Sequence, residues 1–362
     1  AATAAAPSTR VAEPVPIEPP RRALRHRYAE RDWTAAPFRA PRSPTKEAGT
    51  MAEDKVVLVG VDGSPESLGA VDWAVARAAR EGWRVHILCA YSLPSFTAAS
   101  LDGGYAALDD TAIRAGAQAV VDEAVARAQA AGVAVTSSLE TGDPAGVLVD
   151  LSSDAALAVV GTRGGGGFAD RLLGTVSSAL PAHAKCPTVI VPRHTTGTAF
   201  TPVKRIVVGV DGSGSAHKAV RRAVREAEAW DAELTAVAAV PMSTGTGALA
   251  WLPAAVDRQQ VLADVRAGLD HAVAKALEGH PGVTVRRHAL DGNAAELLAE
   301  FSTAVDLVVV GSRGRGGFAG LLLGSTSQAV LSHAACPIMV VPARAKDDDS
   351  AVTRSSVPWE RA

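Results

Sequence analysis

Two copies of a glycine-rich pattern are the residues in this sequence best suited to hold an anion. Both copies follow G-x2-G-x9-G-[S/T]: Gly161, Gly164, Gly174 and Thr175 in the first, and Gly311, Gly314, Gly324 and Ser325 in the second. Glycine lets the backbone approach phosphate oxygens closely and adopt positive φ, so several N–H groups can converge on one anion. The last glycine is expected to open a helix, whose N-terminal N–H groups favour negative charge. The hydroxyls of Thr175, Ser177, Ser325 and Ser327 are candidate additional donors.

An aspartate directly follows an apolar run upstream of each loop, as Asp62 and Asp211. Ligands of parallel α/β sheets bind beyond the carboxyl ends of the strands, where strand order reverses, so we expect aspartate and loop to meet there. The alternative is that Asp-Gly-Ser only forms a tight strand-to-helix turn. Arg163 and Arg313, inside the loops, either pair with phosphate or point to solvent, and the sequence leaves both readings open.

Other reactive side chains give no comparable pattern. Neither loop contains the lysine of G-x4-G-K-[S/T], and no cluster of His or carboxylate residues marks a general base, which argues against efficient hydrolysis. The three cysteines, Cys89, Cys186 and Cys336, lack metal-ligand spacing and are expected to pack as small hydrophobes. His183 and His333 recur near a helix end and are expected to cap or pack there.

The chain repeats itself at a spacing of about 150 residues. Segment 56–64 returns at 206–213, 157–180 returns at 307–330, and 183–192 returns at 333–342. A repeat of this length exceeds the roughly 20–50 residues of solenoids and indicates a duplicated domain.

Each repeat alternates strands and helices. In the first, apolar runs predict strands at 56–61, 83–91, 133–140, 156–161 and 186–192, and helical periodicity predicts helices at 64–82, from about Tyr105 to Ala131, at 144–154 and at 175–184. Ser64 is the expected N-cap of the first helix, Pro65 its first residue and Gly82 its end. Five strands with helical crossovers predict a parallel sheet covered on both faces. Pro187 and Pro192 bracket the last strand and place it at a sheet edge.

Composition limits the classes of function. A hydrophobic content of 48% suits compact domains, and a formal charge of −2 gives no reason to expect nucleic acid or an anionic membrane as partner. No apolar run approaches the roughly 20 residues that span a bilayer, and the N-terminus lacks the apolar core of a secretory signal, so we expect a cytoplasmic protein.

The expected domains are flanked by tails. Residues 1–52 form a Pro- and Arg-rich extension expected to be disordered, with an Arg-rich interaction arm as the alternative, and Met51 resembles a natural start. The domains are expected at 53–194 and 203–344, joined by a linker at 195–202 and followed by a disordered tail at 345–362.

The strand-one aspartate, the glycine loop and the closing Cys-Pro strand resemble the universal stress protein family over 53–194 and 203–344. The resemblance implies two tandem Rossmann-like α/β domains, each a five-stranded parallel sheet of order 3-2-1-4-5 flanked by helices. Strands one and four are then neighbours, which brings Asp62 and Gly161 together and agrees with the switch-point argument. The resemblance also implies an internal pseudo-dimer, with 187–192 paired to 337–342, and leaves a homodimer of two chains open.

In the ATP-binding branch of this family the loop holds ribose and phosphates, the aspartate lies at the nucleoside, and backbone near the end of strand two borders the adenine. By motif, the resemblance assigns nucleotide contacts to Val61, Asp62, Ala90, Gly161, Arg163, Gly164, Gly174, Thr175, Val176 and Ser177, and to Val210, Asp211, Ala239, Gly311, Arg313, Gly314, Gly324, Ser325, Thr326 and Ser327. It implies ATP as the ligand, leaves an accompanying magnesium ion open, and implies no protein metal site.

The resemblance favours a nucleotide-dependent stress-response sensor over a metabolic enzyme. The alternative is slow ATP hydrolysis or autophosphorylation on a loop hydroxyl such as Thr175 or Ser325. A second enzymatic alternative comes from the related adenine-nucleotide α-hydrolases, which have a glycine-serine loop after strand one. The segment VDGSPES resembles that loop only loosely. A purely structural pair of domains would leave both glycine loops unexplained.

Overall fold

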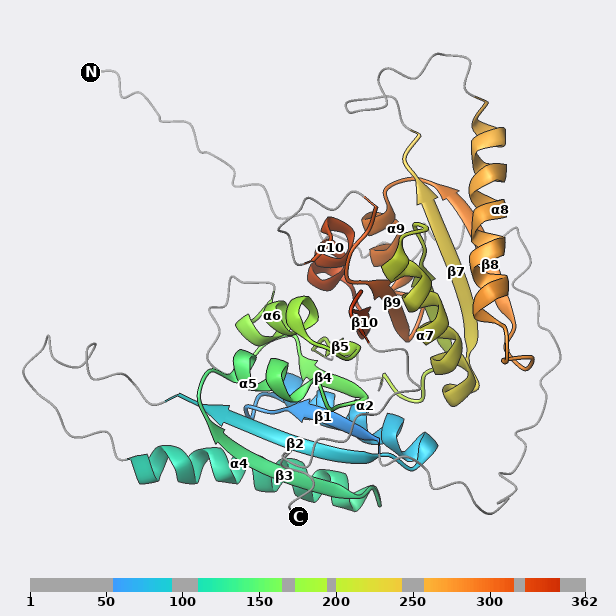
Figure 1. Ribbon diagram of the computed structural model, residues 1–362. Helices are drawn as coiled ribbons and strands as arrows, with labels where there is room; N and C mark the ends of the chain where they lie inside the picture. The colour runs from blue at the N-terminus through green and yellow to red at the C-terminus, as the bar shows by residue number, and fades with distance from the viewer. Residues whose placement is uncertain are drawn as a thin grey trace, which may run out of the picture. The chain divides into compact units, whose positions relative to one another are not determined.

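The computed structural model describes residues 55–92, 110–164, 173–193, 200–242, 257–315 and 323–345 (Figure 1). The predicted N-terminal extension, the C-terminal tail beyond 345 and most of the predicted linker lie outside these residues, as do the middle parts of both glycine loops.

In its described residues, each repeat contains five strands. The first has β1 (Val56–Gly60), β2 (Arg84–Tyr91), β3 (Val135–Thr141), β4 (Leu157–Gly161) and β5 (Thr188–Val191). The second has β6 (Arg205–Gly209), β7 (Glu233–Val240), β8 (Val285–Asp291), β9 (Leu307–Gly311) and β10 (Ile338–Val341). The strands predicted in the first repeat are all present, with boundaries that differ by a few residues.

Helices connect the strands. They are α2 (Pro65–Glu81), α4 (Asp110–Ala130), α5 (Pro144–Leu151) and α6 (Thr175–His183) in the first repeat, and α7 (Gly214–Trp230), α8 (Arg258–Ala276), α9 (Ala294–Phe301) and α10 (Ser325–His333) in the second. The start of the helix predicted from Tyr105 lies outside the described residues. The ends of α2 are those predicted: the Ser67 N–H donates to Ser64 Oγ at 3.2 Å, Pro65 is the first residue, and Gly82 is left-handed at φ 68°.

One ten-stranded sheet runs through both repeats, in the order β3-β2-β1-β4-β5-β10-β9-β6-β7-β8. Within each repeat the order is the predicted 3-2-1-4-5, and every pair is parallel. The expected pairing through the last strands is also present: β5 and β10 are antiparallel, with Ile190 opposite Ile338. The edge that the prolines predicted for β5 is therefore the edge of its repeat, covered by β10.

Apart from the half-exposed outer strands β3 and β8, the strands are buried on both faces because alternate side chains enter two separate apolar clusters. Val57 and Val59 of β1 face α2 and α4, whereas Val56 and Leu58 face α5 and α6. The second repeat does the same with α7 and α8 on one face and α9 and α10 on the other. Among the described residues, no helix has the length and apolar character needed to cross a membrane.

Candidate functional site

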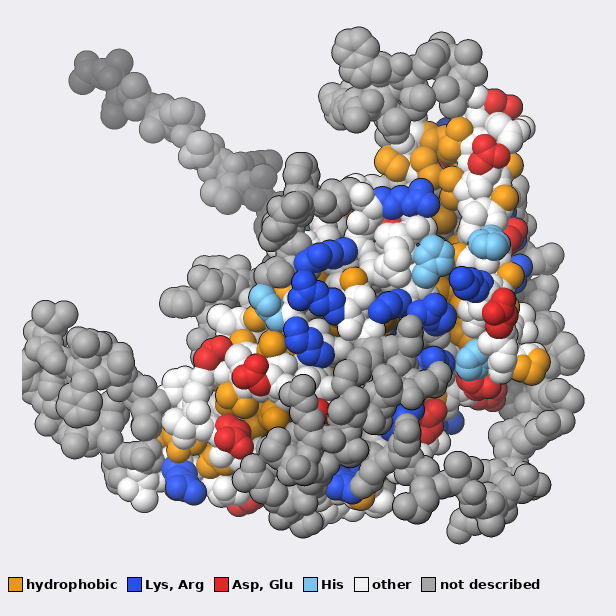
Figure 2. Space-filling view, in the orientation of Figure 1, with side chains coloured by type: hydrophobic (Ala, Val, Ile, Leu, Met, Phe, Trp, Pro, Cys, Tyr) orange, Lys and Arg blue, Asp and Glu red, His pale blue; other side chains and the backbone are white. Residues whose placement is uncertain are grey.

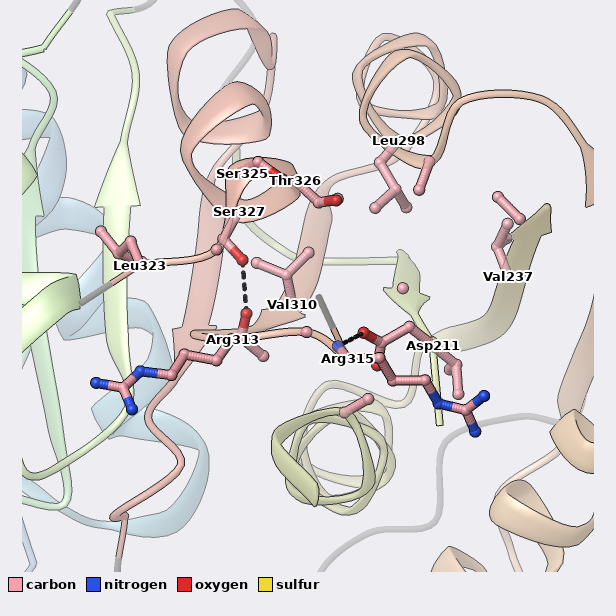
Figure 3. A pocket seen from close by; sticks show the side chains of 18 residues that line it. Asp211, Val237, Leu298, Val310, Arg313, Arg315, Leu323, Ser325, Thr326 and Ser327 are labelled. Atoms are coloured by element: carbon pink, nitrogen blue, oxygen red, sulfur yellow. Dashed lines mark hydrogen bonds between the residues drawn. The ribbon is translucent and has the colours of Figure 1, made fainter. Parts of the chain in front are cut away.

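A pocket of about 400 Å³ lies in the second repeat, at the carboxyl ends of β6, β7 and β9 (Figure 3). All ten residues that the sequence singled out in this repeat line it: Val210, Asp211, Ala239, Gly311, Arg313, Gly314, Gly324, Ser325, Thr326 and Ser327. The point where β6 and β9 lie side by side is the predicted switch point of the sheet.

The aspartate after the first strand of each repeat organises the turn that follows it. Asp211 Oδ1 accepts the Ser213 N–H at 2.9 Å, and Oδ2 accepts the Arg315 N–H at 3.1 Å (Figure 3). In the first repeat, Asp62 Oδ1 accepts the Ser64 N–H at 3.0 Å and the Ser64 hydroxyl at 2.6 Å. The turn-forming role weighed from the sequence is therefore present, and in the second repeat the same carboxylate also holds the glycine loop.

The first two glycines of each loop lie in close contact with other parts of the protein. A Cβ on Gly311 would lie 2.8 Å from the carbonyl carbon of Ser215 in the first turn of α7, and a Cβ on Gly161 would lie 2.7 Å from that of Glu66 in α2. A Cβ on Gly314 would lie 2.6 Å from Asp211 Oδ2. These glycines permit the close approach of strand, helix and loop.

The third glycine makes no such close contact with the residues that the structure describes. Gly324 has φ −71° and ψ 152°, which any residue can adopt, and a Cβ there would meet nothing closer than Gly314 N at 3.4 Å. Gly174 is equivalent, with φ −78°, ψ 172° and a nearest contact of 3.5 Å. Both repeats thus have a glycine that the described packing does not need, at the end of the loop where the helix begins.

The helices that follow these glycines also differ at their first turn. In five other described helices, the side-chain oxygen of the N-cap residue accepts a hydrogen bond from a backbone N–H of the first turn. These N-cap residues are Ser64, Asp143, Ser213, Asp257 and Asn293. The N-cap of α6 and of α10 is glycine and supplies no such acceptor. Among the described residues, the partial positive charge of these two N-termini therefore has no N-cap side chain to offset it.

The serine in the first turn of each of these helices fixes the loop. Ser327 Oγ donates to the Gly311 carbonyl at 2.7 Å, and Ser177 Oγ donates to the Thr162 carbonyl at 2.7 Å. A hydroxyl has one proton to donate. The structure therefore gives these two hydroxyls a partner within the protein, whereas Thr175 and Ser325 are exposed at the start of their helices.

The remaining predicted residues of the first repeat occupy matching places. Val61 donates its N–H to the Leu88 carbonyl at 2.9 Å, next to the half-buried Ala90. Arg163 is exposed, and its carbonyl oxygen lies 3.3 Å from Ser64 Oγ, the hydroxyl whose proton goes to Asp62. Gly164 lies so close to Asp62 that a Cβ there would overlap Asp62 Oδ2. The side chain of Val176 packs against the cluster that contains α5, so it belongs to the core.

The pocket has lining residues that the sequence reading missed. They are Gly209, Ala216, Val237, Ala294, Leu298, Val310, Arg315 and Leu323. Figure 3 shows Val237 and Leu298 on one side of the pocket, across from Thr326 of α10. The signal for Arg315 was present, since it stands inside the glycine pattern, but α9 carries no local sign that Leu298 reaches the switch point.

The charges at the pocket are mixed, and on the face of the molecule drawn in Figure 2 Lys and Arg side chains also occur together with Asp and Glu. Arg313 and Arg315 are exposed, and the Arg315 guanidinium lies over the turn at Gly212. In the first repeat, burial and then the negative charge of Asp62 raise the pKa of the nearby Cys89 thiol, so this cysteine stays protonated. Among the described residues, no group of three or more His, Cys, Asp or Glu side chains is arranged to hold a metal ion.

Comparisons with known proteins agree with this geometry. The profile of the Universal stress protein family matches residues 54–192 and 202–342. Universal stress protein Rv2623 of Mycobacterium tuberculosis H37Rv is 34% identical over 298 residues, which cover 78% of this chain and 95% of that protein. Universal stress protein Rv2005c of the same strain is 33% identical over 289 residues, covering 78% and 96%. The crystal structure of a universal stress protein from Archaeoglobus fulgidus superposes with a TM-score of 0.58 at 21% identity, covering 82% of this chain and 98% of that one.

Proposed function

The chain belongs to the universal stress protein family, and from that premise we propose that it binds ATP at the glycine loop of each repeat and acts as a nucleotide-dependent stress-response sensor. The observation that carries the proposal is the pair of glycines, Gly174 and Gly324, that the described packing does not require. Each stands before a helix without a side-chain cap. A ligand that brings an anion against the backbone supplies the missing reason for both features.

The pocket of the second repeat suits an adenine nucleotide in size and polarity. Its volume of about 400 Å³ falls within the range of small-molecule sites, roughly 300–1,000 Å³. Val237, Ala239 and Leu298 provide an apolar side for a base, while the start of α10 provides the positive side for phosphates (Figure 3). The exposed Arg313 stands on the loop beside them. We place the adenine near β7 and the phosphates at Gly324 on this division.

The same residues favour binding over efficient hydrolysis. Asp211 is the one carboxylate among the described residues that line the pocket, and both of its oxygens accept backbone N–H groups. It is therefore poorly placed to take a proton from water. Magnesium would enter with the triphosphate, since Mg²⁺ is bound largely by phosphate oxygens and water in such sites.

The decisive experiment is calorimetric titration of the nucleotide-stripped protein with ATP. We expect about two sites per chain. Gly324→Asp should leave one, and Gly174→Asp with Gly324→Asp should leave none, because each carboxylate stands where a phosphate would bind. Asp is also a favourable N-cap, so these variants should fold at least as well as the wild type.

Gly324→Asn is the matched control. Asn caps a helix as well as Asp does and is nearly the same size, but it is uncharged. A larger loss of affinity with Asp than with Asn would show that the ligand presents negative charge at this point. Unchanged ATP binding in the Asp variants would refute the site, and formation of ADP or of a phosphoprotein during the titration would replace the sensor with the enzymatic alternative.

A further inference from the structure

A buried ion-pair network joins the two repeats between helices α2 and α7. The Arg77 guanidinium donates to Glu226 from Nε at 2.7 Å and from the second nitrogen, Nη2, at 3.4 Å. Arg77 is 2% exposed and Glu226 is 0% exposed. Each also pairs within its own helix, Arg77 with Glu81 at 3.0 Å and Glu226 with Arg222 at 2.8 Å.

Both groups of the central pair are charged. Burial acts to raise the pKa of Glu226, but the charges of Arg222 and Arg77 outweigh it and hold the pKa below its usual range. Burial likewise acts to lower the pKa of Arg77, and Glu226 reverses the effect. Four alternating charges, Glu81, Arg77, Glu226 and Arg222, therefore cross the contact between the repeats.

Arg77 and Glu226 occupy the same place in their two repeats. They are 149 residues apart, the spacing that separates Asp62 from Asp211. The pair therefore lies at the local twofold relation between the repeats, where a position meets its own counterpart. In a symmetric homodimer, a residue at such a position faces an identical residue of the partner. Here the two residues that face each other carry opposite charges.

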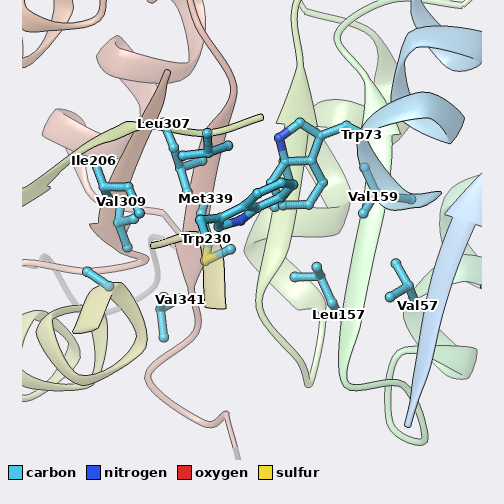
Figure 4. Close-up of a cluster of buried hydrophobic side chains, with 14 of the residues drawn as sticks. Val57, Trp73, Leu157, Val159, Ile206, Trp230, Leu307, Val309, Met339 and Val341 are labelled. Carbon is cyan, nitrogen blue, oxygen red and sulfur yellow. The ribbon is translucent and has the colours of Figure 1, made fainter. Parts of the chain in front are cut away.

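The neighbouring contact follows the same rule. Trp73 of α2 and Trp230 of α7 meet with ring centroids 6.1 Å apart (Figure 4). At the 149-residue spacing the counterpart of Trp73 is Arg222, and the counterpart of Trp230 is Glu81. Tryptophan meets tryptophan only when the first repeat packs on the second.

Pairing of like repeats in this arrangement would be unfavourable. Two first repeats would bury Arg77 against Arg77 and place Trp73 against Glu81. Two second repeats would bury Glu226 against Glu226 and place Trp230 against Arg222. In such pairs two like charges repel each other in a buried contact, and each keeps only the partner in its own helix, so like pairs are disfavoured.

We infer that the α2–α7 contact is a recognition surface that pairs a first repeat with a second repeat and rejects pairs of like repeats. The partner that fits each surface is the opposite repeat of the same chain or, by exchange, of another copy. The chain thus encodes an asymmetric pair on a symmetric fold.

The test reverses the network one helix at a time in the full chain. The α2 variant is Arg77→Glu with Glu81→Arg, and the α7 variant is Arg222→Glu with Glu226→Arg. Each keeps an ion pair inside the helix and reverses the charge at the contact between helices, and the α2 variant also removes the contact of the Arg77 guanidinium with the Trp83 ring, 4.4 Å from its centroid. The full reversal combines all four substitutions, and Arg127→Glu, which removes the exposed pair with Asp72 (46% and 49% exposed), is the control.

We expect each one-helix variant to lower Tm by roughly 6 °C or more, the full reversal to recover at least half of the loss, and the control to stay within roughly 2 °C. Refolding a tagged α2 variant together with an untagged α7 variant should give more co-purification than tagged and untagged wild type do. If a one-helix variant fails to fold, a folded full reversal supports the inference. A full reversal no more stable than the one-helix variants would overturn it.

Discussion

Two glycines of one loop should respond in opposite ways to the same substitution. Gly311 and Gly324 both line the pocket, but a Cβ on Gly311 would lie 2.8 Å from backbone of α7, whereas a Cβ on Gly324 would have at least 3.4 Å. Gly311→Ala therefore forces the helix and the strand apart. Overpacking of this kind costs about 1–3 kcal/mol of unfolding free energy.

Gly324→Ala should leave stability nearly unchanged. Its φ of −71° suits alanine, and the smaller entropy of the unfolded chain contributes about 0.4–1 kcal/mol. The poorer N-cap costs about the same amount. The net change should stay within about 1 kcal/mol, while the methyl group separates the backbone from a phosphate and should weaken ATP binding at least tenfold, or about 1.4 kcal/mol.

Thermal unfolding and calorimetric titration measured on the same preparations decide the matter. We expect Gly311→Ala to lower Tm by roughly 2–10 °C and Gly324→Ala to change Tm by about 2 °C at most. Gly324→Ala should also weaken ATP binding at the second repeat by the factor given above. The equivalent pair in the first repeat, Gly161 and Gly174, provides an internal replicate. If Gly324→Ala binds ATP like the wild type, or loses stability as Gly311→Ala does, the glycine serves the fold and our reasoning fails.

Three further predictions concern titratable and charged side chains. His86 is 0% exposed between Thr136 Oγ1 at 2.8 Å and Ser138 Oγ at 3.0 Å, and burial lowers its pKa from 6.5 to about 4. As the pH falls, the His86 imidazole of the unfolded chain therefore takes up a proton before that of the folded chain does. The free energy of unfolding should fall by about 3 kcal/mol between pH 6.5 and pH 4. Urea unfolding at the two pH values should show a smaller loss for His86→Gln. Arg315→Gln should weaken the binding of ATP several-fold more than that of AMP and reduce the salt dependence of binding, because Arg315 adds positive charge for the outer phosphates. The first repeat has glycine at this position, so the effect should be confined to the second repeat. Equal losses of affinity for both nucleotides would contradict this. Cys89, Cys186 and Cys336 are buried, and burial raises the pKa of the Cys336 thiol, so a thiol reagent should modify none of them in the native protein and all three after denaturation.

The sequence predicts the strands of the first repeat well because their signals are local. Val56–Gly60 and Leu157–Gly161 are apolar runs bounded by turn residues, and a strand buried on both faces has that pattern. The glycine spacing is also local, so the loops could be placed at the switch point without the structure. Assigning which glycine serves the fold and which is free required the distances to Ser215 and Glu66.

Contacts between distant segments were beyond the sequence. Arg77 stands in an Ala-rich helix, and nothing near it indicates that its partner is Glu226 on the other repeat. Leu298 reads as one residue of an amphipathic helix, and only the packing of α9 against β6 and β7 brings it to the pocket. Periodicity shows which face of an element is apolar but does not show what that face meets.

The antiparallel contact of β5 with β10 has a consequence for access to the two loops. Ligand loops follow the carboxyl ends of strands, and this one antiparallel pair makes those ends point in opposite directions in the two repeats. The loops that follow Gly161 and Gly311 therefore lie at opposite ends of the strands, one on each side of the sheet's length. If each loop binds a nucleotide as we propose, the two ligands lie at opposite ends of the strands, and their charges repel little where more than a Debye length of about 8–10 Å of solvent separates them. Each site then fills independently of the other, and a partner that covers one end of the strands leaves the second site accessible.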